Sequence, residues 1–340
     1  MITENAWQPA SALVSLPGAL SSADVREFLQ PELSEGQMRA AEALLEQATA
    51  ILERLTQATV PRFNGRGSLT LRWARGETFN AGALKLFADG HDYLIEISVG
   101  APIVLLAMAH EIWHPAERAH PSRVLAEQDV LSGHMRPGEV TPVAYRTALD
   151  ATYLLYFHEL AHVLCNHCEL EWGETAAVDR RALEYQADYL AGSTFVSHKA
   201  WSNKRRPTDW CSIAEALVSA ALLLSTAFKG FAAPSDGYHL PTNRLIAFMD
   251  GGFQAILDHC ALQTEAPPFA DVNTESAFIR PLMLSFLEHL RASALERLAG
   301  TESEIASDSN QVHTVTRPRA QELSASMGSL WTSLESGVSN

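Results

Sequence analysis

The sequence predicts an α+β fold that is mostly helical and contains one small antiparallel sheet. Several long stretches carry apolar residues three and four positions apart, the spacing of one helix face. Residues 69–99 instead alternate apolar and polar side chains around an Asp-Gly turn signal, which is typical of a strand hairpin. With 47% hydrophobic residues in 340, the chain can bury a sizeable core.

The first predicted helix follows an N-terminal arm. Residues 1–33 are mixed in character and contain proline, and Ser34 with Gln37 then forms a capping-box start. Proline in Val60-Pro61 then disfavours further helix. Before it, apolar residues recur with helical spacing at positions 41, 44, 45, 48, 51, 52 and 55. We therefore expect residues 1–60 to form an arm and a helix.

Strands are expected next. Residues 69–73 alternate, and the segments Leu84–Phe87 and Tyr93–Val99 flank Asp89-Gly90 as the two arms of a hairpin. The apolar run 101–114 predicts a helix that supports this sheet. Residues 115–140 carry proline, glycine, histidine and charges without a clear period, so they predict a surface excursion.

The following helix carries the most informative motif of the chain. Thr141-Pro142 is a favourable helix start, with threonine as the N-cap and proline at the first position. His158 and His162 lie four residues apart in this helix, hence on one face, where both imidazoles can bind one metal ion. Glu159 lies at the edge of that face and could take a proton from a metal-bound water.

A third ligand is expected from a helical hairpin. The first helix is predicted to continue to about Trp172, with Gly173 as the stop, and a second helix to return from about Glu174. Each arm would then cover roughly 15 Å at about 1.5 Å per residue, which brings Glu184 level with His162.

This hairpin completes a recognisable ligand set. Two histidines, one glutamate and a water form a tetrahedral zinc site of the catalytic kind, with His158, His162 and Glu184 as the protein ligands. Asp188 lies one turn beyond Glu184 and could accept the outer N–H of a ligand imidazole. The expected cofactor is therefore Zn²⁺.

A second HExxH match is a weaker candidate. His110 and His114 have the same spacing, but Pro115 follows directly and disfavours the helical geometry that the pair requires. No ExxxD pair follows at hairpin distance. A helix end that meets a polar loop is the simpler interpretation.

The cysteines predict packing and no disulfides. Cys165 and Cys168 form a CxxC after the motif, for which a redox pair or a metal knuckle is conceivable, but core packing on a continuing helix is the better interpretation. His167 is expected to cap or pack. Cys211 and Cys260 complete the set of four, and the sequence shows no secretory signal.

At these residues the chain resembles a known group. His158-Glu159-Leu160-Ala161-His162 followed by Glu184–Asp188 is similar to the gluzincin zinc peptidases with an HExxH…ExxxD signature, among them HtpX-like proteases and Lit-type phage-exclusion peptidases. Phe79-Asn80-Ala81 and the strand through Ile95 and Ile97 are similar to the hairpin that flanks the substrate cleft there. The likeness covers roughly residues 79–244, and the lack of predicted membrane spans favours the Lit-like branch.

The resemblance implies a zincin-like metallopeptidase domain over residues 61–299. Tyr238–Arg244 is similar to the downstream HP…R segment, which implies that His239, Tyr238 or Arg244 assists the oxyanion, with Glu159 as catalytic base. It also implies a protein or peptide substrate inside the cell, since Lit-type relatives cleave a translation elongation factor during phage infection, and this protein is itself expected to be cytoplasmic.

Composition limits the partners. The net charge of -15 argues against nucleic acid or an anionic membrane, and the basic cluster at 198–206 is expected to be a solvated loop. The longest apolar run, 216–228, is shorter than the roughly 20 residues that span a bilayer and predicts a buried helix. Helices are expected at 210–231, 241–260 and 274–299, and a polar, disordered or loosely packed tail at 300–340.

The sequence thus predicts a zinc endopeptidase that acts on an intracellular protein, in one version a phage-defence protease. Two alternatives stay open. One is a catalytically silent zinc-binding or protein-interaction module with the same fold, against which the intact Glu159 argues. The other is a metal-free helical interaction protein, against which the ExxxD pair argues. The oligomeric state is left open.

Overall fold

The computed structural model gives the fold of most of the chain. It describes residues 35–63, 67–75, 79–87, 90–113, 140–170, 175–202, 209–231, 239, 241–263, 272–292, 307–308 and 310–327. The fold is mostly helical with a small three-stranded mixed sheet, which agrees with the predicted α+β class. Some predicted features lie outside the described residues: the arm 1–33 and Ser34, the greater part of the excursion 115–140, His114, Lys204–Arg206 and Tyr238.

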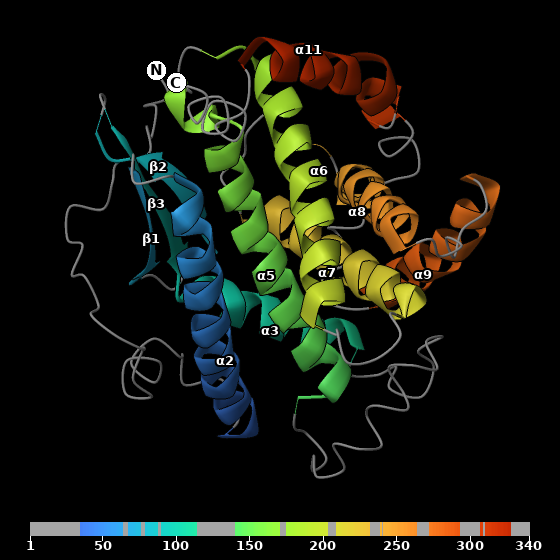
Figure 1. The fold of residues 1–340 in the computed structure, drawn as a ribbon. Coiled ribbons are helices and arrows are strands. Elements are labelled where there is room, and N and C mark those ends of the chain that lie inside the picture. Colours follow the sequence, from blue (N-terminus) through green and yellow to red (C-terminus); the bar gives the residue numbers. More distant parts are fainter. Residues whose placement is uncertain are drawn as a thin grey trace, which may run out of the picture.

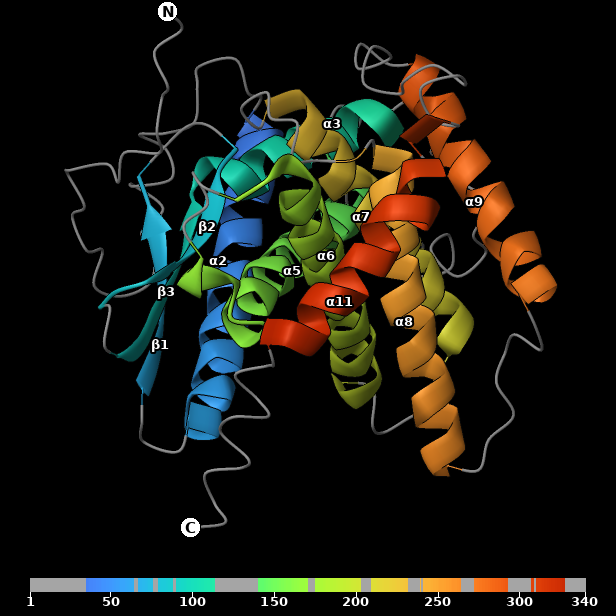
Figure 2. The ribbon, with the colours of Figure 1, turned by 90° about the horizontal axis from the view of Figure 1, so that it is seen from above.

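The helices form the bulk of the molecule. They are α2 (Glu35–Thr59), α3 (Gly100–Trp113), α5 (Pro142–Leu164), α6 (Ala177–Ser202), α7 (Trp210–Phe231), α8 (Pro241–Gln263), α9 (Val272–Ala292) and α11 (Arg317–Met327), with short segments η1 (Val60–Phe63), η3 (His167–Glu169) and η5 (Val312–Thr316). The sheet lies on one side next to α2, α5 runs through the middle, and α9 lies on the side away from the sheet (Figures 1 and 2). Helix α11 crosses over α6 (Figure 1).

The sheet contains the predicted hairpin but is mixed. Strands β2 (Ala81–Lys85) and β3 (His91–Ser98) pair antiparallel, whereas β1 (Gly67–Ala74) pairs with β3 in parallel, in the order β1-β3-β2. The prediction of an antiparallel sheet is therefore wrong for β1. Alternating apolar residues indicate which face of a strand is buried, but they carry no information on the direction of its partner.

Helix α2 shares one hydrophobic core with the sheet and α5. Its Leu44, Leu45 and Leu52 are fully buried in the same cluster as Ile95 and Ile97 of β3. The boundary expected near residue 60 therefore does not separate two cores.

The start of α5 is as predicted, and its whole length is central. The Thr141 side chain accepts a hydrogen bond from the Ala144 N–H at 3.0 Å, with Pro142 in the first turn. Thr56 of α2 and the buried Tyr156 hydroxyl lie 2.8 Å apart, which anchors α5 one half-turn before its first motif histidine. Because α5 is buried along nearly all its residues, the motif is enclosed by the fold.

Helix α7 is a core helix in this fold. By length and composition alone its stretch Trp210–Gly230 would suffice to cross a membrane, and it is longer than the apolar run seen in the sequence. In the structure 67% of the most apolar part of this stretch is buried, and α7 packs against α5 and α8.

The helical hairpin exists with different arms. Helix α5 ends at Leu164 instead of Trp172, because Asn166 adopts a left-handed conformation with φ 61° that terminates the helix. The chain then makes the turn η3, and α6 begins at Ala177 instead of Glu174. The CxxC residues therefore do not lie on a continuing helix, and the prediction of two ten-residue arms is wrong.

The C-terminal segment also corrects the prediction. Within 300–340, residues 310–327 are helical and pack against α6, and their Val312 and Ala320 share a buried cluster with Ala247 of α8, so they are not a loose tail. Val312, Thr316 and Ala320 are spaced by four and all buried. These three residues form a narrow buried stripe in which Thr316 is polar. The apolar periodicity of the segment is therefore weak in the sequence. Arg319 adds an ion pair with Asp179 at 2.6 Å.

Helices α6 and α8 approach each other unusually closely through two glycines. A methyl group on Gly192 of α6 would lie 2.0 Å from the Phe248 carbonyl oxygen of α8. Reciprocally, a methyl group on Gly251 of α8 would lie 1.8 Å from the Tyr189 carbonyl oxygen of α6. Since backbone occupies the space in both cases, the missing side chains set the distance between these helices.

We predict that Gly251→Ala lowers the free energy of unfolding by about 1–3 kcal/mol, because α6 and α8 must move apart to admit the methyl group. Gly82→Ala is the matched control, since a methyl group there would meet nothing within 4 Å, and we expect a change of no more than about 0.5 kcal/mol. Urea denaturation of both variants measures this. A Gly251→Ala variant as stable as the Gly82→Ala control would show that α6 and α8 can accommodate the added methyl group.

Candidate metal centre

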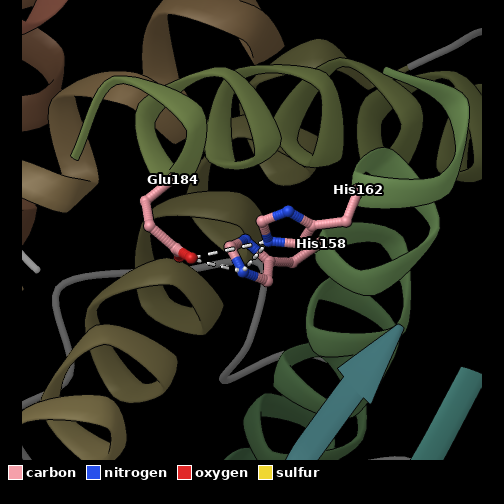
Figure 3. Close-up of side chains that lie close together, drawn as sticks. All are labelled: His158, His162 and Glu184. Carbon is pink, nitrogen blue, oxygen red and sulfur yellow. Dashed lines mark hydrogen bonds and ion pairs between the residues drawn. The ribbon is translucent and has the colours of Figure 1, made fainter. Parts of the chain in front are cut away.

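Three metal-ligating side chains converge from two helices. His158 and His162 project from α5 toward Glu184 of α6 (Figure 3). The two Nε2 atoms lie 3.1 Å apart, His158 Nε2 lies 3.3 Å from one Glu184 oxygen, and His162 Nε2 lies 3.6 Å from the other. All three side chains are buried.

The donor set fits a small tetrahedral cation. Bonds of about 2.0–2.1 Å to zinc place tetrahedral ligand atoms about 3.3 Å from one another. His158 Nε2 is close to this distance from both His162 Nε2, at 3.1 Å, and Glu184 Oε2, at 3.3 Å, and His162 Nε2 lies 3.6 Å from the other oxygen, Oε1. One ligand atom from each residue lies within 4.8 Å of the others, so the cluster could hold a metal ion.

A carboxylate behind His158 fixes the orientation of its ring. Asp188 Oδ1 lies 2.8 Å from His158 Nδ1, so this nitrogen carries the proton and Nε2 faces the other ligands. The placement is the one that the sequence suggests for Asp188. Burial alone would lower the pKa of His158, but its contacts with Asp188 and Glu184 outweigh burial and raise it to about 10.

Arg244 supports Asp188 instead of facing a substrate. Its Nε and Nη2 atoms donate to the two oxygens of Asp188 at 2.7 and 2.6 Å. The guanidinium also lies 4.1 Å from the ring centre of Phe228, and Nη2 lies 3.6 Å from Glu184. The predicted role at the oxyanion is therefore not supported by its position, because a buried guanidinium requires a buried carboxylate as its partner.

His239 contacts the C-terminal segment through both ring nitrogens, and the catalytic role expected for it stays a prediction. Its Nδ1 is 2.6 Å from Asp308 and its Nε2 is 2.9 Å from Thr316. Asn243 donates to the same Asp308 at 2.7 Å. Both ring nitrogens of His239 thus bind the C-terminal segment, and the residue joins that segment to the start of α8.

Glu159 lies next to the cluster without belonging to it. It is 5% exposed, and burial raises its pKa to about 7 even though the neighbouring His158 opposes the shift. A carboxylate whose pKa is near neutral pH can both accept and release a proton there. Such a pKa suits the role of general base that the sequence suggests for Glu159.

Glu184 and Asp188 are ionised. Burial alone would raise both pKa values, but His158 and His162 hold the pKa of Glu184 below its ordinary value. Arg244 and then His158 do the same for the pKa of Asp188.

Three further residues lie beside the cluster: His167, which the sequence analysis expected to cap or pack, and Gln186 and Phe228, to which it gave no role. His167 Nδ1 lies 2.9 Å from His162 Nδ1, and Gln186 lies 3.0 Å from the other nitrogen of His167. Phe228 of α7 packs against the His158 ring at 5.5 Å between ring centres. The left-handed Asn166 turns the chain back to place His167, and no spacing rule in the sequence signals this.

His110 of the second motif and the cysteines are not members of the metal-ligating group found among the described residues. His110 lies in the last turn of α3 beside a small cavity that Ala41 of α2 also lines. In the described part of the chain, the group of His158, His162 and Glu184 is the one that could hold a metal ion. All four cysteines are free, and Cys165 is buried, which agrees with packing.

Comparison with protein-family models, with curated proteins and with solved structures gives no match. The metal centre is therefore defined by the geometry of this chain alone.

The buried imidazoles predict a specific pH dependence. Burial lowers the pKa of His167 to about 4. The unfolded chain therefore binds a proton at this residue below about pH 6.5 while the folded chain does not, so the stability it contributes is lost as the pH falls from about 6.5 to 4. We predict a loss on the order of 3 kcal/mol from His167 in the metal-free protein.

The comparison with His167→Asn isolates this contribution. Other groups titrate in the same range, notably Glu159, whose raised pKa acts in the opposite direction, but they cancel in the difference between the two proteins. Denaturation with a chelator present, repeated from about pH 7 to 4.5, should show a shallower acid decline for the variant. Parallel curves would mean that His167 is not held neutral.

Proposed function

We propose that the protein is a zinc-dependent endopeptidase that uses Glu159 as general base. The observation that carries the proposal is the convergence of two imidazoles and one carboxylate beside a second carboxylate that is buried but is not a ligand. Two histidines and one glutamate are a ligand set of catalytic zinc sites, which leaves a fourth position for water.

The buried carboxylate supports catalysis more than storage or structure. Metal binding needs His158, His162 and Glu184, but it does not need Glu159. Burying this carboxylate costs free energy, as its raised pKa shows, and a silent site would gain nothing from it. This favours a peptidase over the alternative of a silent zinc-binding module.

The roles of the residues follow from their positions. His158, His162 and Glu184 would hold the zinc ion, which when bound supplies a Lewis acid and lowers the pKa of a coordinated water. Glu159 accepts the proton of the attacking water on its carboxylate and delivers it to the nitrogen of the leaving amine. Asp188 holds the His158 ring in place through Nδ1.

The proposed substrate is an extended segment of an intracellular protein. In the gluzincins that the chain resembles, a strand hairpin flanks the substrate cleft. Here β2 is an edge strand of the sheet and packs beside α5, so it could pair with such a segment. A phage-defence protease is the version of this proposal that follows from the resemblance to Lit-like peptidases.

The metal content is the first test. We expect about one zinc ion per purified chain, lost in His158→Ala and in His162→Ala because each removes a ligand. His110→Ala is the matched control from the second motif and should keep the metal. Elemental analysis after dialysis decides, and loss of zinc from the control alone would mean that the metal site lies elsewhere.

Glu159→Gln tests the mechanism. The amide is nearly isosteric, so the fold and the zinc should be retained, but it cannot accept the proton and the rate should fall by about 10²–10⁴. A substrate is first identified by comparing the new protein N-termini that appear in cells expressing the wild type and in cells expressing the variant. The cleavage rates of the purified wild type and the purified variant on this substrate are then measured. Full activity of the variant would exclude the mechanism, and loss of zinc would make Glu159 a ligand.

A further inference from the structure

His162 has a partner of a different kind from that of His158. The carboxylate Asp188 holds His158, whereas a second histidine, His167, lies against His162 with 2.9 Å between their Nδ1 atoms. His167 is 0% exposed, and its ring centre lies 5.0 Å from that of His162. On its far side, His167 Nε2 lies 3.0 Å from Gln186 Oε1.

These distances define one proton arrangement that suits a metal ligand. To bind a cation through Nε2, His162 must keep a lone pair there and carry its proton on Nδ1. That N–H can donate only if His167 presents a lone pair at its own Nδ1. His167 then carries its proton on Nε2 and donates it to the carbonyl oxygen of Gln186.

The reverse arrangement would oppose metal binding. If His167 carried its proton on Nδ1 and donated to His162, the proton of a neutral His162 would lie on Nε2, toward Glu184 and His158. The Gln186 oxygen facing His167 favours the first arrangement, because an oxygen can only accept.

We propose that His167 is a positioning residue of the metal centre, which fixes the tautomer and ring orientation of His162 by accepting its Nδ1–H and is itself held by Gln186. The proposal rests on the metal site of the proposed function. It extends that site to the turn after α5, where the left-handed Asn166 directs His167 back toward the helix.

Two substitutions separate positioning from packing. His167→Phe keeps a buried ring and removes the acceptor, whereas His167→Asn loses the ring and keeps an oxygen that can lie close to the former Nδ1. A packing role predicts that Phe is tolerated better than Asn. A positioning role predicts the opposite order for metal affinity.

Zinc affinity, measured by competition with a chelator, is the first readout. We expect about a 10–100-fold loss in His167→Phe, as for the removal of other partners of ligand histidines, and a change within about threefold in His167→Asn. Wild-type affinity in the Phe variant, or tighter binding by Phe than by Asn, would overturn the proposal.

The tautomer of His162 is the second readout and needs neither metal nor a variant. Nitrogen NMR of the metal-free wild type should show the His162 proton on Nδ1, and a proton on Nε2 would refute the proposed role. A wild-type protein that takes up no zinc would refute the proposed function instead, and this spectrum would then decide alone about His167.

Discussion

The site depends on one buried carboxylate that is shared between two partners. Asp188 accepts two hydrogen bonds from Arg244 and lies 2.8 Å from His158, so three helices meet at one side chain. A buried ion pair is stable only while both charges remain, and loss of either leaves an uncompensated charge. The close approach at Gly192 and Gly251 serves this contact, because it sets the distance between the helices that carry Asp188 and Arg244.

The charges of the site are those of a place that could hold a cation. Glu159, Glu184 and Asp188 would bring three negative charges into the interior, and Arg244 supplies one positive charge. A divalent cation would bring the sum to zero, three negative and three positive. In the metal-free protein His158, whose pKa is raised to about 10, carries a second positive charge, and burial raises the pKa of Glu159 to about 7, so this carboxylate is partly protonated at neutral pH. The neutral partner of His162, which is His167, and the Gln186 side chain beyond it leave this balance unchanged.

The ligand pattern was predictable from sequence because it lies within regular helices. The i, i+4 spacing of His158 and His162, and of Glu184 and Asp188, places each pair on one helix face wherever the helices lie. The helix ends were not predictable in the same way, because Asn166 stops α5 where a glycine was sought at 173. The partners of Arg244 and His239 depend on tertiary packing. The sequence could therefore indicate that both residues matter, but it could not pair Arg244 with Asp188 or His239 with Asp308. The parallel direction of β1 was not predictable for a similar reason, because the alternation of apolar residues does not indicate which strand is the partner or in which direction it runs.

The bond between His239 and the C-terminal segment has a consequence for biosynthesis. Asp308 and Thr316 hold His239, and His239 lies just before α8, which carries Arg244. These two contacts involve residues that leave the ribosome after all the metal ligands have emerged. The nascent chain therefore contains His158, His162 and Glu184 before it contains the residues that hold the start of α8.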